Sequence, residues 1–272
     1  MLWFLILLLA VIQGVTEFLP VSSSGHLVVV QELFRQLGHP IPEKETLLLD
    51  VALHFGTVLS ILVFFRRRIW DMVARDWRLI GLIVVASIPA GIAGITLKNQ
   101  FEAMFEQPLY VGCFFFITGG MLLWAAWFSK RRQGETTCGT LTFGRALWIG
   151  LFQAFAILPG VSRSGSTITA GIGAGMQREE AATFSMLLAI PVIGGAGLLE
   201  AHKRYNTALD PTFALMLLVG VAVSFLVGLA AIWVLLRVLN QGRLQWFAWW
   251  VIGLGTIVVL WQLLWPYQAP AV

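Results

Sequence analysis

Long apolar stretches separated by short polar segments dominate the chain. Six of the stretches are continuous enough to form single helices of bilayer length, at about 46–65, 79–97, 109–128, 181–200, 213–236 and 245–265. A helix that crosses the hydrocarbon core needs roughly 20 mostly apolar residues. The pattern therefore predicts an all-α polytopic membrane protein with six spanning helices.

Two further pairs of apolar arms are too short or too interrupted to span. The first pair, 2–19 and 26–37, flanks "PVSSSG", and the second, 145–158 and 166–176, flanks "PGVSRSG". Irregular backbone at membrane depth is tolerated only where it is buried in protein or lines a wet cavity. Each pair is therefore predicted to form a re-entrant helical hairpin with its tip inside the membrane.

Charge in the connecting segments indicates sidedness. The segments 66–78, 129–145, 177–180 and 237–243 hold 12 Lys and Arg, whereas 38–45, 98–108 and 201–212 hold four. Cytoplasmic loops carry an excess of Lys and Arg. The first set is therefore placed in the cytoplasm, so the first hairpin enters from outside and the second from inside.

The two halves of the chain resemble each other with inverted sidedness. An offset of 140 aligns Gln13 with Gln153, Val21 with Val161, Ser22 with Ser162, Ser24 with Ser164 and Gly25 with Gly165. We therefore predict one membrane domain made of a first repeat (1–128), a cytoplasmic basic connector (129–144) and a second repeat (145–272). Inverted repeats commonly place their site between broken helices near the midplane.

Composition supports a membrane protein. The chain is 58% hydrophobic and 12% charged, whereas soluble domains carry about 25% charged residues. The net charge of +4 is too modest to indicate nucleic-acid binding. Cys113 and Cys138 form neither a disulfide framework nor a metal motif. Residues 2–12 lack a basic flank and a cleavage site, so they are interpreted as mature protein.

The two tips carry the candidate chemistry. Helices are expected to start near His26 and Ser166, and free N–H groups at helix N-termini suit phosphate. Hydroxyls and glycines surround both starts, at Ser22, Ser23, Ser24, Gly25, Ser162, Ser164, Gly165, Ser166 and Thr167. Arg163 adds a charged planar fork. Close helix packing would also explain the small residues, and a salt bridge to Glu17 would explain Arg163.

Glu17 and His26 are the other polar anomalies at the first tip. A carboxylate beside a phosphate is repulsive unless it is protonated or a divalent cation lies between them, and Mg²⁺ or Ca²⁺ takes oxygen ligands. Gln13 lies one helical turn before Glu17 and offers an amide oxygen. His26 either caps its helix, accepts a proton from a serine hydroxyl or acts as a nucleophile. Asp50 and His54 form another i, i+4 pair, for which an interfacial role is expected.

The segments "EFLPVSSSGH" (17–26) and "LPGVSRSGST" (158–167) resemble the two signature motifs of the bacterial undecaprenyl-diphosphatase family, of the bacitracin-resistance type. The resemblance implies an inner-membrane enzyme that removes the terminal phosphate of undecaprenyl diphosphate, depends on a divalent metal and opens to the periplasm. By position it assigns site roles to Glu17, Ser23, His26, Ser162, Arg163, Ser164 and Thr167. Gln13 departs from the pattern, since some members have glutamate there.

Two mechanisms and one other function stay open at this stage. Ser23 attacks the terminal phosphorus with His26 as base, or His26 attacks directly, while Arg163 and a cation held by Glu17 and Gln13 neutralise charge. The rival function is an inverted-repeat transporter of a lipid phosphate or small anion. Expected partners are the lipid substrate and membrane lipid, and a homodimer is left open.

Overall fold

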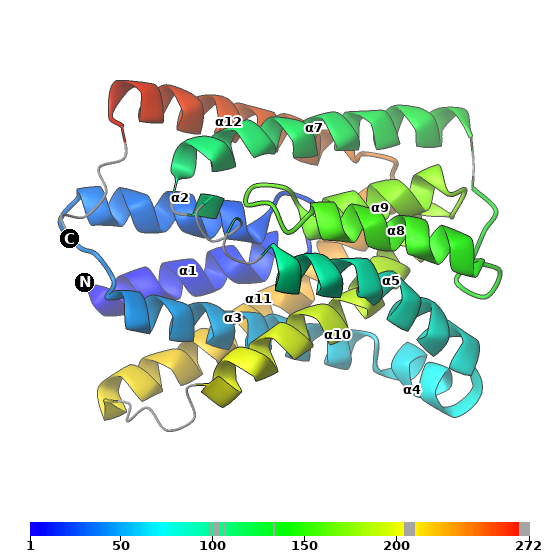
Figure 1. Cartoon of the computed structure of the whole chain (residues 1–272), viewed down its shortest axis with the longest axis horizontal. Helices are drawn as coiled ribbons and strands as arrows, with labels where there is room; N and C mark the ends of the chain where they lie inside the picture. Colours follow the sequence, from blue (N-terminus) through cyan, green and yellow to red (C-terminus); the bar gives the residue numbers. More distant parts are fainter. Residues whose placement is uncertain (98–99, 101–103, 106, 133, 204–209, 267–272) are drawn as a thin grey trace.

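The computed structural model describes the chain except residues 98–99, 101–103, 106, 133, 204–209 and 267–272. The described residues are helical, apart from loops and one isolated bridge between Thr136 and Met176. The helices are α1 (Leu2–Thr16), α2 (Ser23–Gln36), α3 (Glu43–Phe64), α4 (Arg66–Arg75), α5 (Trp77–Thr96), α7 (Pro108–Arg131), α8 (Phe143–Phe155), α9 (Arg163–Gly173), α10 (Arg178–Lys203), α11 (Pro211–Asn240) and α12 (Gln245–Leu264). The all-α prediction is confirmed (Figure 1).

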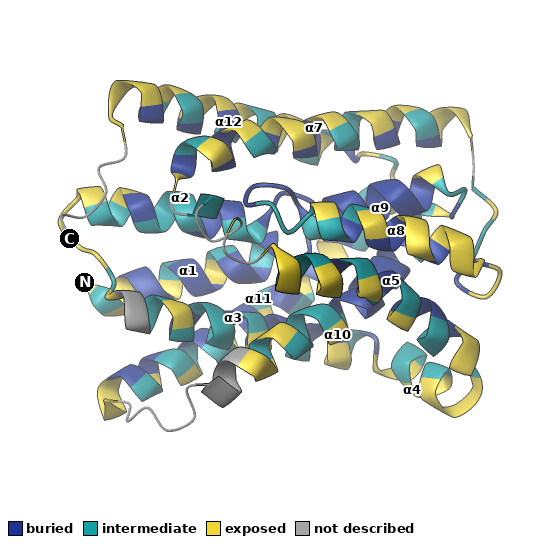
Figure 2. Ribbon diagram, viewed as in Figure 1, coloured by how far each residue is buried: buried dark blue, intermediate teal, exposed yellow. Residues whose placement is uncertain are grey.

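Six helices are long and apolar enough to cross a membrane, namely α3, α5, α7, α10, α11 and α12. The prediction of six spanning helices is confirmed at that level. Figure 2 shows exposed residues along the outer sides of these helices, and many of the exposed residues are large and apolar. On α5, for example, Val84, Ile88 and Ile92 lie four residues apart and are 54%, 50% and 59% exposed. Such a stripe would be a liability in water, and it is explained by a lipid surrounding.

Two helical hairpins are broken where the sequence predicted. Helices α1 and α2 have 15 and 14 residues, and α8 and α9 have 13 and 11. At 1.5 Å per residue these helices are about 16–23 Å long, shorter than the hydrocarbon core. In Figure 1 the α1–α2 hairpin comes from the left end and the α8–α9 hairpin from the right, and their tips meet in the middle.

Equivalent helices of the two halves pack on helices of the opposite half. Helix α1 packs on α11 and α8 packs on α5, while α7 and α12 pack on each other. Small residues allow these close approaches. A Cβ on Gly255 of α12 would lie 2.9 Å from the carbonyl oxygen of Gly112 on α7. The packing supports an inverted repeat, and the boundaries at 128/129 and 144/145 stay predictions.

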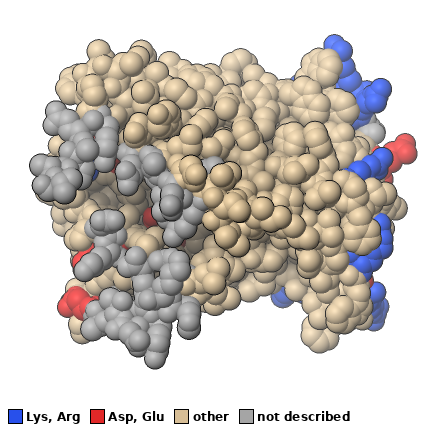
Figure 3. Space-filling model, viewed as in Figure 1, with Lys and Arg blue, Asp and Glu red and all other residues tan. Residues whose placement is uncertain are grey.

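Basic side chains gather at one end of the molecule. Figure 3 shows Lys and Arg at the right end, where Figure 1 places α4 and the connector that follows α7. Helix α4 has no buried residue. Thr136 N of the connector donates a hydrogen bond to Gly175 O, just after the end of α9, at 3.0 Å. Among the loop residues counted for the opposite end, Lys98 and Arg204 lie outside the described residues, as do the side chains of Lys44 and Lys203. The sidedness stays a prediction.

Candidate active site

The second helix of each hairpin starts at the tip in the same way. Ser22 and Ser162 are the N-caps of α2 and α9, and their Oγ atoms accept from Gly25 N at 3.3 Å and Gly165 N at 3.0 Å. A serine cap satisfies one of the free N–H groups of a helix start. Both helices therefore begin three residues earlier than expected, at Ser23 and Arg163.

This start gives Ser23 and Arg163 equivalent places, since the offset of 140 that relates the halves also relates these two residues. The equivalence is not perfect in the backbone. Ser22 has a φ of 70°, whereas Ser162 has a φ of −73°. A non-glycine residue at positive φ costs about 1–3 kcal/mol and is concentrated at functional sites. The first tip is therefore the strained one.

The two tips are in direct contact. Ser164 Oγ donates to Leu19 O at 3.1 Å, and a Cβ on Gly25 would lie 3.1 Å from Gly160 Cα. Thr118 of α7 holds the second tip, since its Oγ1 donates to Gly160 O at 2.9 Å and accepts from Ser162 N at 3.0 Å. Residues far apart in sequence thus form one polar centre inside an otherwise apolar bundle.

Arg163 and Glu17 form an ion pair between the tips. Arg163 Nη2 donates to Glu17 Oε1 at 2.6 Å, and the two side chains are 13% and 5% exposed. The salt bridge to Glu17 that the sequence offered as one explanation of Arg163 is therefore present in the structure. Arg163 Nη1 also donates to Ser185 O at 3.1 Å, while its Nε is buried without a partner. Arg163 therefore keeps N–H donors for a further anion.

Ser23 is paired with the carboxylate rather than with the histidine. Its Oγ donates to Glu17 Oε2 at 2.7 Å. His26 Nδ1 lies 2.7 Å from Ser22 O, and Trp250 Nε1 donates to His26 Nε2 at 3.0 Å. Since a carbonyl oxygen only accepts, Nδ1 carries the proton and Nε2 the lone pair that Trp250 occupies. The carboxylate, and not the expected imidazole, is positioned to take the proton of Ser23.

The remaining hydroxyls are mostly engaged within the tips. Ser162 Oγ and Ser164 Oγ lie 3.2 Å apart, and Ser22 Oγ and Ser24 Oγ 3.4 Å apart. Thr167 Oγ1 donates to Arg163 O at 2.8 Å. Ser162, Ser164 and Thr167 are each only 1% exposed, whereas Ser23, Ser24 and Arg163 are partly exposed. The accessible part of the site is therefore the edge formed by Ser23, Ser24 and Arg163.

Gln13 and His54 complete the surroundings of Glu17. Gln13 is fully buried, and its Nε2 donates to Glu17 Oε2 at 3.0 Å while its Oε1 has no partner. His54 Nε2 lies 3.6 Å from the same Oε2. Within the described residues no three His, Cys, Asp or Glu side chains are grouped as a metal site. A cation here would need the amide oxygen and oxygens of a substrate, which is the usual arrangement for Mg²⁺.

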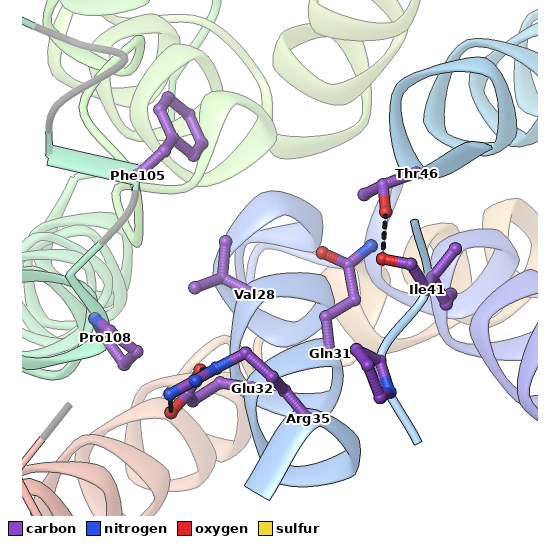
Figure 4. A pocket seen from close by; sticks show the side chains of 9 residues that line it. Val28, Gln31, Glu32, Arg35, Ile41, Thr46, Phe105 and Pro108 are labelled. Atoms are coloured by element: carbon purple, nitrogen blue, oxygen red, sulfur yellow. Dashed lines mark hydrogen bonds and ion pairs between the residues drawn. The ribbon is translucent and has the colours of Figure 1, made fainter. Parts of the chain in front are cut away.

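A cavity of about 180 Å³ lies beside the outer part of α2 (Figure 4). Its polar lining includes Gln31, Glu32, Arg35 and Thr46, with the Arg35–Glu32 ion pair at 2.6 Å. Gln31 Nε2 also donates to Asp50 Oδ1 of α3 at 3.3 Å. Asp50 lies one helical turn before His54 on α3.

Sequence reasoning missed three residues that support the site. Ser185 of α10 holds Arg163 through its carbonyl and contacts Thr167 Oγ1 through its Oγ at 2.6 Å. Thr118 of α7 and Trp250 of α12 make the contacts described above. Each comes from a spanning helix that carries no motif, so no local signal could have identified it. His54, in contrast, belongs to the i, i+4 pair with Asp50 that the sequence singles out.

Comparisons with known proteins agree with this site. The family model described as "Bacitracin resistance protein BacA" matches residues 6–257. A protein of Rhodopirellula baltica named undecaprenyl-diphosphatase is 42% identical over 261 residues, covering 94% of this chain and 96% of the relative. A protein of the same name from Trichlorobacter lovleyi is 40% identical over 268 residues, covering 93% and 95%.

A third relative of that name, from Desulfosudis oleivorans, is 41% identical over 275 residues, covering 93% of this chain and 96% of the relative. The matched region contains both tips and all six candidate spanning helices apart from the last turns of α12. Family membership thus rests on nearly the whole chain and includes the residues at the tips: the chain belongs to the bacitracin resistance protein BacA family.

Proposed function

We propose that the chain is an undecaprenyl-diphosphatase, which hydrolyses the terminal phosphate of undecaprenyl diphosphate to give undecaprenyl phosphate and inorganic phosphate. The observation that carries the proposal is the position of Glu17 between two reactive partners. Its Oε2 accepts from Ser23 Oγ at 2.7 Å, and its Oε1 accepts from Arg163 at 2.6 Å. A nucleophile (Ser23), a base (Glu17) and a cationic group that can bind phosphate (Arg163) therefore lie next to one another.

Substrate binding uses the two helix N-termini and Arg163. The diphosphate competes with Glu17 for the guanidinium, whose unpartnered Nε adds a donor. The N-terminal ends of α2 and α9 meet at the tips and attract negative charge. Ser22, Ser24, Ser162, Ser164 and Thr167, with Gly25 and Gly165, shape this phosphate-binding surface. Catalysis would then come mainly from positioning and charge stabilisation.

The chemical step is assigned to Ser23. Its Oγ attacks the terminal phosphorus while Glu17 takes the hydroxyl proton, and the bond from phosphorus to the bridging oxygen breaks. Undecaprenyl phosphate leaves with that oxygen. Water then attacks the phosphoserine, inorganic phosphate is released, and Ser23 regains a proton. Direct attack by His26 would first require its Nε2 to lose the hydrogen bond from Trp250, so Ser23 is favoured.

The divalent cation implied by the family fits the donors at the first tip. Glu17 supplies a carboxylate, and the buried Gln13 Oε1 is an acceptor without a partner. Both are oxygen ligands of the kind that Mg²⁺ and Ca²⁺ prefer. When bound, such a cation would neutralise part of the diphosphate charge.

The family and the charge distribution support a proposed location. We place the chain in the bacterial inner membrane with the basic end in the cytoplasm and the α1–α2 hairpin entering from the periplasm. There the reaction would recycle the lipid carrier for peptidoglycan synthesis and, in abundance, confer bacitracin resistance. A homodimer is not needed by this site.

One argument favours the transporter alternative, because inverted repeats with broken helices are common in transporters. The Ser23–Glu17 hydrogen bond argues against it, because a carrier does not need a serine held by a base.

Phosphate release by purified protein tests the proposal. Detergent-purified wild type is given undecaprenyl diphosphate with Mg²⁺, Ca²⁺ or EDTA, beside Arg163→Ala. We expect metal-dependent release that Arg163→Ala loses almost completely while still inserting in the membrane. Absence of release from folded wild type would contradict the proposed function, and lipid-phosphate movement in liposomes would then be measured.

A further inference from the structure

His54 is held in an orientation that points its Nε2 at Glu17. Its Nδ1 lies 2.7 Å from Asp50 O, one turn back on α3. A carbonyl oxygen only accepts, so Nδ1 carries the proton. Nε2 then faces Glu17 Oε2 at 3.6 Å. At 3.6 Å the two atoms are too far apart for a direct hydrogen bond, and an ion between them would contact both.

A buried amide on the same carboxylate has an unsatisfied oxygen. Gln13 is 0% exposed and its Oε1 has no hydrogen-bond partner, which is unfavourable for a buried acceptor. Its Nε2 lies 3.0 Å from Glu17 Oε2. Turning the amide by 180° would place the oxygen there, since the two amide atoms are nearly interchangeable in shape. The Gln13 oxygen would then face Glu17 Oε2, which His54 Nε2 also faces.

We propose that His54 Nε2, Glu17 Oε2 and Gln13 Oε1 form the protein side of a divalent-cation site, which phosphate oxygens of the substrate complete. The imidazole makes the site prefer a first-row transition cation such as Mn²⁺ over Ca²⁺. This inference rests on the proposed function and names the cation ligands of that same site. In this chain the imidazole of His54 compensates for the neutral amide at position 13.

The geometry agrees with ligation. Two ligands about 2.1 Å from one metal are roughly 3.0–3.5 Å apart, close to the 3.6 Å between Glu17 Oε2 and His54 Nε2. Metal-binding histidines usually donate their other ring N–H to a carbonyl or carboxylate, as His54 does to Asp50 O. Glu17 Oε2 keeps one lone pair for Ser23 and offers the other to the cation.

Charge explains why substrate oxygens are required. Arg163 already neutralises Glu17 at 2.6 Å, so a divalent cation alone would leave the buried centre with two excess positive charges. A diphosphate or phosphate anion restores the balance. The cation is therefore expected to bind together with the anion, and the absence of a larger group of acidic, His and Cys ligands among the described residues fits this shared site.

The ligands can be identified without measuring turnover. Purified full-length protein is incubated with Mn²⁺ and inorganic phosphate, and pulsed electron paramagnetic resonance detects nitrogen coupled to the manganese. We expect an imidazole coupling in wild type that His54→Gln loses, with Mn²⁺ affinity lowered by about tenfold or more. The glutamine keeps an oxygen donor, so Ca²⁺ affinity should change less. His39→Gln, on an exposed loop residue, is the matched control and should keep the coupling.

A folding failure of His54→Gln does not leave the question open. Wild type grown with ¹⁵N-histidine must show the coupling change from ¹⁴N to ¹⁵N. Loss of the coupling in His39→Gln, its survival in His54→Gln or its absence from wild type would overturn the inference and leave His54 as an ion-pair partner of Glu17. Phosphate release by the same wild-type sample reports on the proposed function separately.

Discussion

Replacing Glu17 by glutamine tests the assignment of the base most directly. Glu17 is 6% exposed, accepts from Ser23 at 2.7 Å and pairs with Arg163 at 2.6 Å. The amide has nearly the same shape, but it neither neutralises Arg163 nor takes a proton from Ser23. Breaking a buried pair by removing one partner costs about 3–5 kcal/mol. Glutamine keeps an acceptor, so we expect the lower end of that range.

The effect on turnover should be larger than the effect on folding. A positioned general base contributes about 10²- to 10⁴-fold, and we expect phosphate release to fall by at least about 100-fold. That fall equals about 2.7 kcal/mol of transition-state stabilisation. Thermal unfolding of the same detergent samples, followed by tryptophan fluorescence, shows whether the protein is still folded when release is measured.

Glu32→Gln is the matched control for a buried carboxylate that pairs with an arginine. Glu32 is also 6% exposed, and it pairs with Arg35 at 2.6 Å on α2, away from the tips. We expect it to lower stability modestly, because Arg35 is 31% exposed, and to keep most of the phosphate release. If Glu17→Gln kept more than a tenth of wild-type release, Glu17 would not be the base. An equal loss of phosphate release in Glu32→Gln would show that the loss follows from removing any buried carboxylate that pairs with an arginine.

Three further changes test the tips and the connector. Gly25→Ala places a Cβ 2.7 Å from the Phe115 ring, so we expect about 1–3 kcal/mol of destabilisation, seen as a lower melting temperature. Trp250→Phe removes the hydrogen bond to His26 Nε2 and should cost less than about tenfold in phosphate release; a clear rise in release would instead favour His26 as the nucleophile, because its Nε2 is then free to attack. Burial raises the pKa of Cys138 to about 12, so the thiol should resist alkylation at pH 8 until the protein is denatured. Because its folded pKa lies above the ordinary 9.0, the stability it contributes is complete below pH 9 and is lost as pH rises toward 12.

The positions of the hairpins could be predicted because they depend on local chain properties. Hydrophobic length decides which segments can span, and "PVSSSG" and "PGVSRSG" interrupt their helices at whatever position the fold gives them. The helix starts predicted near His26 and Ser166 are three residues too late, because the prediction assigns the serines to phosphate binding or close packing and not to helix capping. Ser22 and Ser162 act as caps, which brings Ser23 and Arg163 into the helices as their first residues.

The pairings within the site could not be predicted, since they depend on helices that meet only in the folded chain. Local sequence was enough to predict the membrane class, the two tips and the residue types that could bind a phosphate. Only helix packing brings Ser23 to Glu17, Trp250 Nε1 to His26 Nε2, and His54 of α3 to the same carboxylate. A hydrogen bond requires its partners within about 3 Å, and only packing of the spanning helices sets distances that short between residues far apart in the chain.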